Sequence, residues 1–284
     1  MEKSMVLLTL TLVLAATAQI STSDAAAQVA MRFLNNLSAH ELSPGRTVSL
    51  SDYDLANSDL TRRRFYVRIG PYAVSGNAAT GQIHHFTYMP DRAEDVPPDQ
   101  VLDLTTDTLH PRAKIIHNLS NLGGSMSELV KLRSSIGSGA AEGSVEVNGR
   151  ISLAGYQLWG GQLYRFDRAG RLLNFASLSV PKPPAEIKVT KTFEEAREAA
   201  VAAAMPFVRS MRAGRPVMLE VNEQYTRQQP VLWQPSPRIG ETLAPEYQAI
   251  RDADSCLAVY AIVLDAVNQE TGRGGPAARV MVDA

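Results

Sequence analysis

The chain has 284 residues, of which 45% are hydrophobic and 20% charged, and 28 Lys and Arg against 29 Asp and Glu leave a formal net charge of −1. This composition is typical of a globular protein with one large or two small domains. The balanced charge argues against nucleic acid as the main partner, because phosphate binding needs a clustered excess of Lys and Arg. The single cysteine, Cys256, excludes an intramolecular disulfide and a cysteine-rich metal site, and we interpret it as a buried structural thiol.

Residues 1–18 have the pattern of a secretory signal peptide. A polar start is followed by an apolar run over residues 5–14, and Ala16 and Ala18 form an A-x-A cleavage site that makes Gln19 the new N-terminus. The run is shorter than the about 20 residues that a transmembrane helix needs, and no other stretch is apolar enough to span. An uncleaved N-terminal anchor and a buried first helix are the alternatives. We expect an exported protein of the periplasm, cell envelope or extracellular space, without stable membrane insertion after signal removal.

Residues 19–90 predict an N-terminal module. Apolar residues recur every three or four positions over residues 24–37, which predicts an amphipathic helix. Strands are predicted at residues 65–69, 72–75 and 82–88, with turn residues between them. A helix followed by a small antiparallel sheet is about the smallest unit that can bury one of its faces.

Residues 91–143 predict a linker. The first part of this segment is rich in Asp and Pro, residues 125–133 predict a short helix, and residues 134–144 are rich in Gly, Ser and Ala. The segment therefore separates the N-terminal module from the rest of the chain.

Residues 144–284 predict a β-hairpin segment followed by a C-terminal module. Alternating strands are expected at residues 144–153, 155–159, 162–166 and 172–178, joined by Gly-containing turns.

The C-terminal module begins with a helix predicted over residues 193–205. Thr192 and Glu195 form a capping box at its start, and Pro206 follows it. Further strands are expected at residues 218–225, 230–233, 257–267 and 279–283.

A short motif occurs after each of the two helices. It consists of Tyr, then Asn-Ala or Asp-Ala, then Thr-Gly, at Tyr72, Asn77-Ala78 and Thr80-Gly81 and again at Tyr260, Asp265-Ala266 and Thr271-Gly272. One residue separates the two dipeptides in the first copy and four separate them in the second. This pattern resembles the PepSY domain, and the two copies resemble the repeated PepSY-like domains of the YcdB and YcdC type.

The middle of the chain is similar to a protease propeptide. Residues 156–172 contain a strand and an Asp-x-x-Gly-Arg turn, and Thr192-Phe193-Glu194-Glu195-Ala196 follows a proline-containing link. This order resembles the segment that precedes PepSY in secreted thermolysin- and fungalysin-type metalloproteases. The resemblance implies an α+β fold with two small cystatin-like or PepSY-like modules, joined by a β-rich middle segment. It also implies a role in chaperoning or inhibiting a peptidase, or in protein interaction in the envelope.

A search for chemistry gives no catalytic, metal or cofactor site. The chain has no H-E-x-x-H, no G-x-S-x-G and no P-loop. His84 and His85 are adjacent on a predicted strand, so their side chains point to opposite faces and do not share one metal. No catalytic residues transfer from the resemblance, because those belong to a protease domain. We expect a protein that is not an enzyme and uses no cofactor.

Three aromatic residues are weak candidates for binding: Trp159, Tyr164 and Trp233. A place in the core is the alternative for each tryptophan. The function we expect is protein binding through a sheet face or by addition of a strand from the partner, which we expect to be a secreted peptidase. The alternatives are a carrier of small apolar ligands with a cavity lined by these aromatic residues, a structural envelope protein, and an enzyme of unrecognised type.

Overall fold

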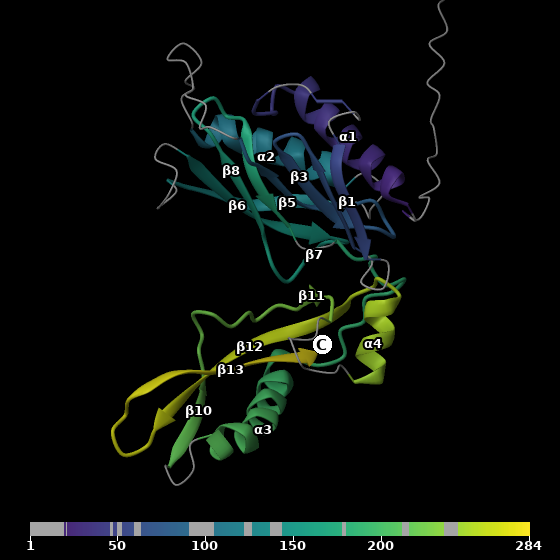
Figure 1. Ribbon diagram of the computed structural model, residues 1–284. Helices are drawn as coiled ribbons and strands as arrows, with labels where there is room; N and C mark the ends of the chain where they lie inside the picture. Colours follow the sequence, from purple (N-terminus) through teal and green to yellow (C-terminus); the bar gives the residue numbers. More distant parts are fainter. Residues whose placement is uncertain are drawn as a thin grey trace, which may run out of the picture.

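The computed structural model describes residues 20, 22–45, 48–49, 53–59, 64–90, 105–121, 127–136, 144–177, 180–211, 216–235 and 244–284. The predicted signal peptide, with Ala16, Ala18 and Gln19, lies outside the described residues. Within them the chain forms two antiparallel sheets and four helices, which confirms the α+β class. Figure 1 shows one sheet with α1 and α2 in the upper part and the other with α3 and α4 in the lower part.

The larger sheet contains the strands of the first two thirds of the chain. In order across the sheet they are β1 (Tyr53–Asp59), β2 (Arg64–Ile69), β3 (Tyr72–Asn77), β4 (Ile83–Tyr88), β9 (Leu172–Ala176), β8 (Gln162–Phe166), β6 (Val145–Leu153) and β5 (Ser127–Ile136), and the short β7 (Tyr156–Gln157) pairs with β6. β4 pairs with β9, with Phe86 opposite Phe175. This pairing places the hairpin segment in the N-terminal sheet, whereas the sequence had grouped it with residues 144–284.

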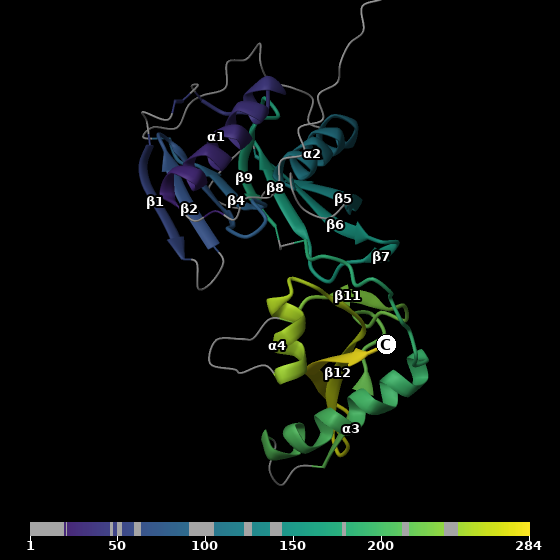
Figure 2. The same ribbon diagram turned by 90° about the vertical axis from the view of Figure 1, so that its right-hand side faces the viewer.

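Helices α1 (Ser23–Ala39) and α2 (Thr106–Ser120) share one core with the larger sheet (Figure 2). α1 buries Phe33 and Leu37 together with a row of alanines, as its apolar periodicity predicts. The Thr22 hydroxyl caps the helix by accepting a hydrogen bond from the Ala25 amide at 3.1 Å. Small residues on its buried face let the helix lie close to the strands.

The segment predicted as a linker contains a helix and a strand. α2 buries Leu109, Ala113 and Ile116 at helical spacing, and it continues through Pro111. The proline and the acidic stretch before it hid this periodicity from the sequence pattern. Residues 125–133 were predicted as a short helix, and the described part of them belongs to β5. The prediction was wrong because pairing with β6 outweighs the local helical spacing of the apolar residues.

The smaller sheet is built around β12 (Leu257–Asn268). β12 pairs with β10 (Val217–Val221) and β11 (Val231–Trp233) along one edge and with β13 (Gly274–Asp283) along the other. α3 (Phe193–Met211) packs its small side chains against one face of this sheet. The remaining helix, α4 (Pro245–Asp252), precedes β12 in the chain.

The capping box predicted at the start of α3 is present. The Thr192 amide donates to the Glu195 carboxylate at 2.7 Å, and the Glu195 amide donates to the Thr192 hydroxyl at 3.3 Å. The end of the helix differs from the prediction, because α3 continues through Pro206 to Met211.

The two Thr-Gly turns share the same hydrogen bonds. Asn77 opens the first turn and Asn268 the second, and each side-chain oxygen accepts from the amide two residues on at 2.8 Å. The closing glycines, Gly81 and Gly272, donate to the Asn carbonyls at 2.8 and 2.9 Å and have φ of 73° and 64°. Such positive φ angles favour glycine. The residue equivalent to Asn77 is therefore Asn268, and the apparent insertion after Asp265 in the second motif disappears.

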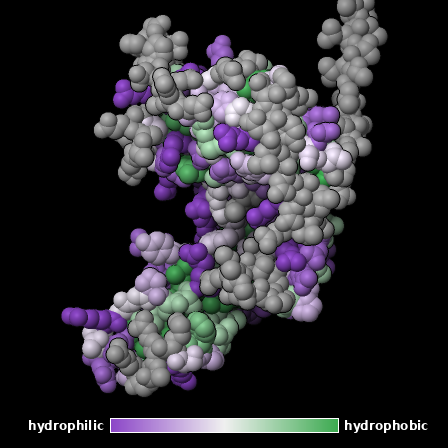
Figure 3. Space-filling view, viewed as in Figure 1, coloured by the Kyte–Doolittle hydropathy of each residue, from purple (hydrophilic) through white to green (hydrophobic). Residues whose placement is uncertain are grey.

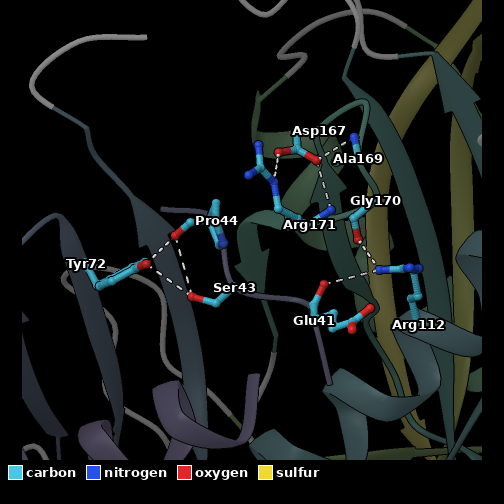
Figure 4. A network of polar contacts seen from close by, with 9 residues as sticks. All are labelled: Glu41, Ser43, Pro44, Tyr72, Arg112, Asp167, Ala169, Gly170 and Arg171. Atoms are coloured by element: carbon cyan, nitrogen blue, oxygen red, sulfur yellow. Dashed lines mark hydrogen bonds and ion pairs between the residues drawn. The ribbon is translucent and has the colours of Figure 1, made fainter. Parts of the chain in front are cut away.

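The Asp-x-x-Gly-Arg motif forms a closed turn between β8 and β9 (Figure 4). One oxygen of Asp167 accepts from the Ala169 and Arg171 amides, each at 2.9 Å, and the other lies 2.7 Å from the Arg171 guanidinium. Arg112 of α2 donates to the Gly170 carbonyl at 3.0 Å. The motif thus has a structural role, since it fixes the turn on which α2 is held.

The segment after α1 is held on the other side of the same network. The Tyr72 hydroxyl donates to the Pro44 carbonyl and lies 3.1 Å from the Ser43 hydroxyl (Figure 4). Arg112 also reaches the Glu41 carbonyl at 3.5 Å. These contacts tie the chain between α1 and β1 to the sheet and to α2.

Replacing Asp167 by alanine removes three hydrogen-bond acceptor contacts from a nearly buried turn. We expect Asp167→Ala to lower the free energy of unfolding by about 1–3 kcal/mol, because the freed amides are left without their partner. Asp167→Asn keeps one acceptor oxygen and should lose less. Urea denaturation measures both variants, and an unchanged midpoint for Asp167→Ala would show that the turn does not depend on this carboxylate.

The burial of His84 predicts a loss of stability in mild acid. Burial, with the charge of Arg64 as a second cause, lowers its pKa from 6.5 to about 4, and its Nε2 has no partner among the described residues. The folded state holds the ring neutral, whereas the unfolded chain takes up a proton as the pH falls below 6.5. Unfolding therefore becomes easier from about pH 6.5 down to about pH 4.

The variant His84→Gln isolates this contribution. Between pH 7 and pH 5 its loss of unfolding free energy should be smaller than that of the parent by about 2 kcal/mol. The remaining slope then belongs to other groups, including His117, whose pKa burial also lowers. Equal slopes for parent and variant would contradict the assignment.

Candidate binding surface

Tyr164, one of the three aromatic candidates, lies in the core of the larger sheet. Its side chain is 0% exposed, and its ring lies 5.2 Å from Phe175 and 6.5 Å from Phe166 between centroids. Its hydroxyl donates to the Gln162 side chain, and burial raises the pKa of Tyr164 well above its usual value. It therefore does not line a surface with the two tryptophans.

The two tryptophans come together on one face of the smaller sheet. We define this tryptophan face by three buried residues and the partly buried side chains around them: Val231, Val259 and Ala261, with Trp159, Trp233, Leu257 and Met281. The neighbouring residues of β12, such as Tyr260 and Ile262, pack instead in the core with α3. Because side chains alternate along a strand, the tryptophan face is the one turned away from α3.

Trp159 reaches this face from the larger sheet. It follows β7, and its amide donates to the Leu232 carbonyl of β11 at 2.7 Å. The preceding residue, Leu158, forms a parallel bridge with Leu232 and is buried in the core with α3. The β7 turn is thus anchored to the smaller sheet by both backbone pairing and apolar burial.

Two guanidinium groups lie against the Trp159 ring. Arg279 of β13 is 5.1 Å from the ring centroid, and Arg227, before β11, is 5.9 Å from it. Both distances lie within the range of cation–π contacts. Arg227 also donates to the Gln157 side chain, and burial together with the nearby charge of Arg150 lowers its pKa. The aromatic surface is therefore flanked by fixed positive charge.

α4 borders the other end of the tryptophan face. The Tyr247 ring meets the Trp233 ring edge to face, with 5.9 Å between centroids. Its hydroxyl donates to the Asp283 carboxylate at 3.3 Å. Burial and the charge of Asp283 raise the pKa of Tyr247. This contact joins α4 to the end of β13.

β13 has one edge that pairs with no strand among the described residues. The Ala284 amide donates to the Ala258 carbonyl at 3.0 Å, and Tyr260 lies opposite Val282. Since hydrogen-bonded and non-hydrogen-bonded pairs alternate in an antiparallel ladder, the backbone groups of Arg279 and Met281 point away from β12. These outward groups border the tryptophan face, since both side chains belong to that face.

The described residues lack a cluster of metal ligands, and their one thiol is buried. No group of three or more His, Cys, Asp and Glu side chains among them lies close enough to hold a metal ion. None of the described helices is both long and apolar enough to cross a membrane. The Cys256 thiol is 2% exposed and donates to the Lys182 carbonyl at 3.6 Å, and burial with the charge of Asp254 raises its pKa to about 11.

Comparison with known proteins gives a weak similarity to a solved structure. No family model matches the chain, and no curated protein matches it significantly. A solved structure, the Bacillus megaterium YpeB C-terminal domain, is similar at 10% identity over 94% of this chain and 100% of that chain, with a TM-score of 0.35. A similarity this weak says nothing about function.

Sequence reasoning found Trp159 and Trp233 but missed the groups that surround them. Arg227, Arg279 and Tyr247 lie far from Trp159 in sequence, and no local motif marks them. The alternation of Arg279 with Met281 in the last predicted strand was the one available signal, since it places both residues on one face.

The environment of Cys256 predicts an unreactive thiol. At pH 8 a pKa of about 11 leaves on the order of one thiolate in a thousand, and the buried sulfur is shielded from reagents. We expect 5,5′-dithiobis(2-nitrobenzoic acid) to label the folded protein at least about a hundredfold more slowly than the urea-unfolded protein. Complete labelling of the folded protein at the unfolded rate would show that this part of the structure opens.

Proposed function

We propose that the chain is an exported, non-enzymatic protein-binding module of the PepSY-like kind. It binds an extended segment of a partner protein along β13, beside the tryptophan face. The observation that carries the proposal is the outer edge of β13, which pairs with no strand among the described residues. Strand addition to such an edge is a common way of binding an extended peptide.

The composition of β13 supports this edge over the β5 edge of the larger sheet. Its only proline, Pro276, lies near its start, so residues 277–283 retain every backbone amide. β5, at one edge of the larger sheet, carries Lys131 with a positive φ of 52° within an irregular stretch of pairing. Irregular pairing and charge protect an edge against strand addition. The one register shift of β13 lies near its start, and the strand pairs regularly with β12 from Ala278 to Asp283, beside aromatic side chains.

A secreted peptidase is the first partner to test. The segment from Tyr156 to Arg171 resembles the protease propeptide, and the chain has none of the catalytic motifs of the corresponding proteases. By this resemblance the chain would act on a peptidase carried by another protein. The N-terminal signal pattern supports meeting that partner outside the cytoplasm.

Titration of the purified protein into a thermolysin-type metalloprotease tests the proposal. We expect stoichiometric loss of peptidase activity. Met281→Pro removes one outward amide of β13 and leaves the ladder with β12 intact, so inhibition should weaken at least about tenfold. Met281→Ala keeps that amide but shortens a side chain of the tryptophan face, so this matched control should lose much less inhibition than Met281→Pro.

Two results would contradict this prediction. Full peptidase activity at a tenfold excess of intact protein would exclude this class of partner. Equal inhibition by the parent and Met281→Pro, with equal thermal midpoints, would show that the partner does not use the β13 edge.

A further inference from the structure

Four basic side chains from both sheets converge around the turn that carries Trp159. Arg227 and Lys131 both donate to the Gln157 side-chain oxygen, the latter at 3.3 Å. Arg279 lies against the Trp159 ring, as described above. The fourth, Arg150 of β6, donates to the Gly160 carbonyl at 2.6 Å and lies close enough to Arg227 to lower its pKa. We call Lys131, Arg150, Arg227 and Arg279 the basic cluster.

The basic cluster holds no ion pair among the described residues. The ion pairs among the described residues join other cations to acids, as in Arg165 with Glu146 and Arg171 with Asp167. Glu128 is an acid that the sheet register brings near Gln157, because it lies opposite Ser152 and Ser152 lies opposite Gln157. It forms no ion pair with any of the four cations. Lys131, Arg150 and Arg227 contact neutral oxygens and Arg279 contacts an indole ring, so these contacts orient the cations without neutralising them.

An acid on the smaller sheet is engaged elsewhere. One oxygen of Asp265 accepts from the Asn222 side chain at 2.8 Å, and the other is buried without a partner among the described residues. Neither oxygen forms an ion pair with Arg279 or Arg227. Like charges gathered without a counter-charge destabilise a folded protein, in a chain whose net charge is −1. Such an arrangement is expected where an anionic ligand supplies the missing charge.

The molecular surface is hollowed between the two sheets. Figure 3 shows the surface hollowed between its upper and lower parts, with hydrophilic residues on the walls of the hollow. In the same view of Figure 1 the hollow lies between β6 above and the connection leading to β11 below. Among the cluster residues, Lys131 and Arg279 are exposed and Arg150 and Arg227 are partly buried, so solvent reaches each of them. Each guanidinium has five N–H donors, so most remain available to an anion.

We propose that the basic cluster binds the carboxylates of an acidic segment of the partner protein. This inference rests on the proposed function, because it takes the partner to be a protein that adds a strand to β13. Arg279 belongs to β13 itself, so a segment paired with the outer edge of this strand passes directly beside it. Because alternate side chains of a strand point to one face, acidic residues two positions apart would face the cluster together. Guanidinium groups suit carboxylates because they donate two parallel hydrogen bonds.

The probe for this site is a hexaglutamate peptide. In Trp233→Phe, Trp159 is the only tryptophan, and its fluorescence reports on the cluster directly. We expect a saturable change on titration with hexaglutamate and none with hexaglutamine. Raising NaCl from about 20 to about 200 mM should weaken binding by about tenfold or more, because the interaction is between charges. Inorganic phosphate and a hexathymidylate are titrated in parallel to separate other anions from an acidic peptide.

Charge-matched variants show whether the cluster is the site. Arg227→Gln with Arg279→Gln removes two charges from the cluster and should weaken hexaglutamate binding by at least about tenfold. Arg197→Gln with Arg251→Gln removes two charges from surface ion pairs on α3 and α4 and should leave binding unchanged. Lys131→Gln, which changes an exposed side chain on β5, is a milder second variant and should weaken binding severalfold. Thermal midpoints establish that each variant is folded.

Three outcomes would overturn the inference. They are no saturable response to hexaglutamate at low salt, equal weakening by the two double variants, and tighter binding of phosphate or hexathymidylate than of hexaglutamate. The proposed function fails separately. If Arg227→Gln with Arg279→Gln still inhibits a peptidase through β13, the acidic-segment inference falls and strand addition stands. If hexaglutamate binds but Met281→Pro changes no partner binding, strand addition to β13 falls and the binding of acidic segments by the cluster stands.

Discussion

The docking of the β7 turn on β11 is the contact on which the candidate surface depends. The bridge between Leu158 and Leu232, with the Trp159 amide bonded to the Leu232 carbonyl, joins two sheets that otherwise have separate cores. Leu158, Ile151 and Leu153 belong to the core beneath α3 although they come from the β6–β7 region. The apolar burial of these side chains supplies the stabilisation, and the backbone pairing fixes the register. Without this docking Trp159 would not lie on the smaller sheet.

This docking also explains why the basic side chains come together. Lys131 and Arg150 are on strands of the larger sheet. Arg279 is on β13 of the smaller sheet, and Arg227 lies in the connection between β10 and β11. Gln157 accepts hydrogen bonds from Lys131 and Arg227, so one amide oxygen links cations of both sheets. The repulsion among these charges opposes the docking, and an anion bound between them would strengthen it. Binding of an anion there would therefore be coupled in energy to the relative placement of the two sheets.

The sequence predicted the local features of the fold well. The α+β class follows from helices and strands with clear periodicity, and the Thr192–Glu195 capping box and the β8–β9 turn at Asp167 are set by side chains within a few residues of one another. The errors have long-range causes. The periodicity of Leu109, Ala113 and Ile116 is interrupted by Pro111, and β5 owes its strand conformation to β6. The pairing of Phe86 with Phe175 joins segments that no local pattern connects.

The candidate surface was less predictable than the fold for the same reason. Trp159 and Trp233 were selected because they are aromatic residues in predicted strands. The same criterion selected Tyr164, which is buried in another core. Local sequence cannot distinguish these cases, because exposure depends on which sheet each strand joins. Arg227 and Arg279 are ordinary surface arginines in sequence, and their meeting over one indole ring depends on three separate segments.

The β13 edge and the basic cluster would contribute differently to the recognition of a partner. Backbone hydrogen bonds along β13 are available to any extended peptide, because every residue except proline offers the same amide and carbonyl groups. They contribute affinity but do not distinguish one segment from another. The basic cluster would distinguish between segments, because it would repel a basic segment in the same position. A neutral segment would leave the charges of the cluster without a counter-charge. A pairing of this kind selects its partner through the charge of alternate side chains while the sheet edge holds the backbone.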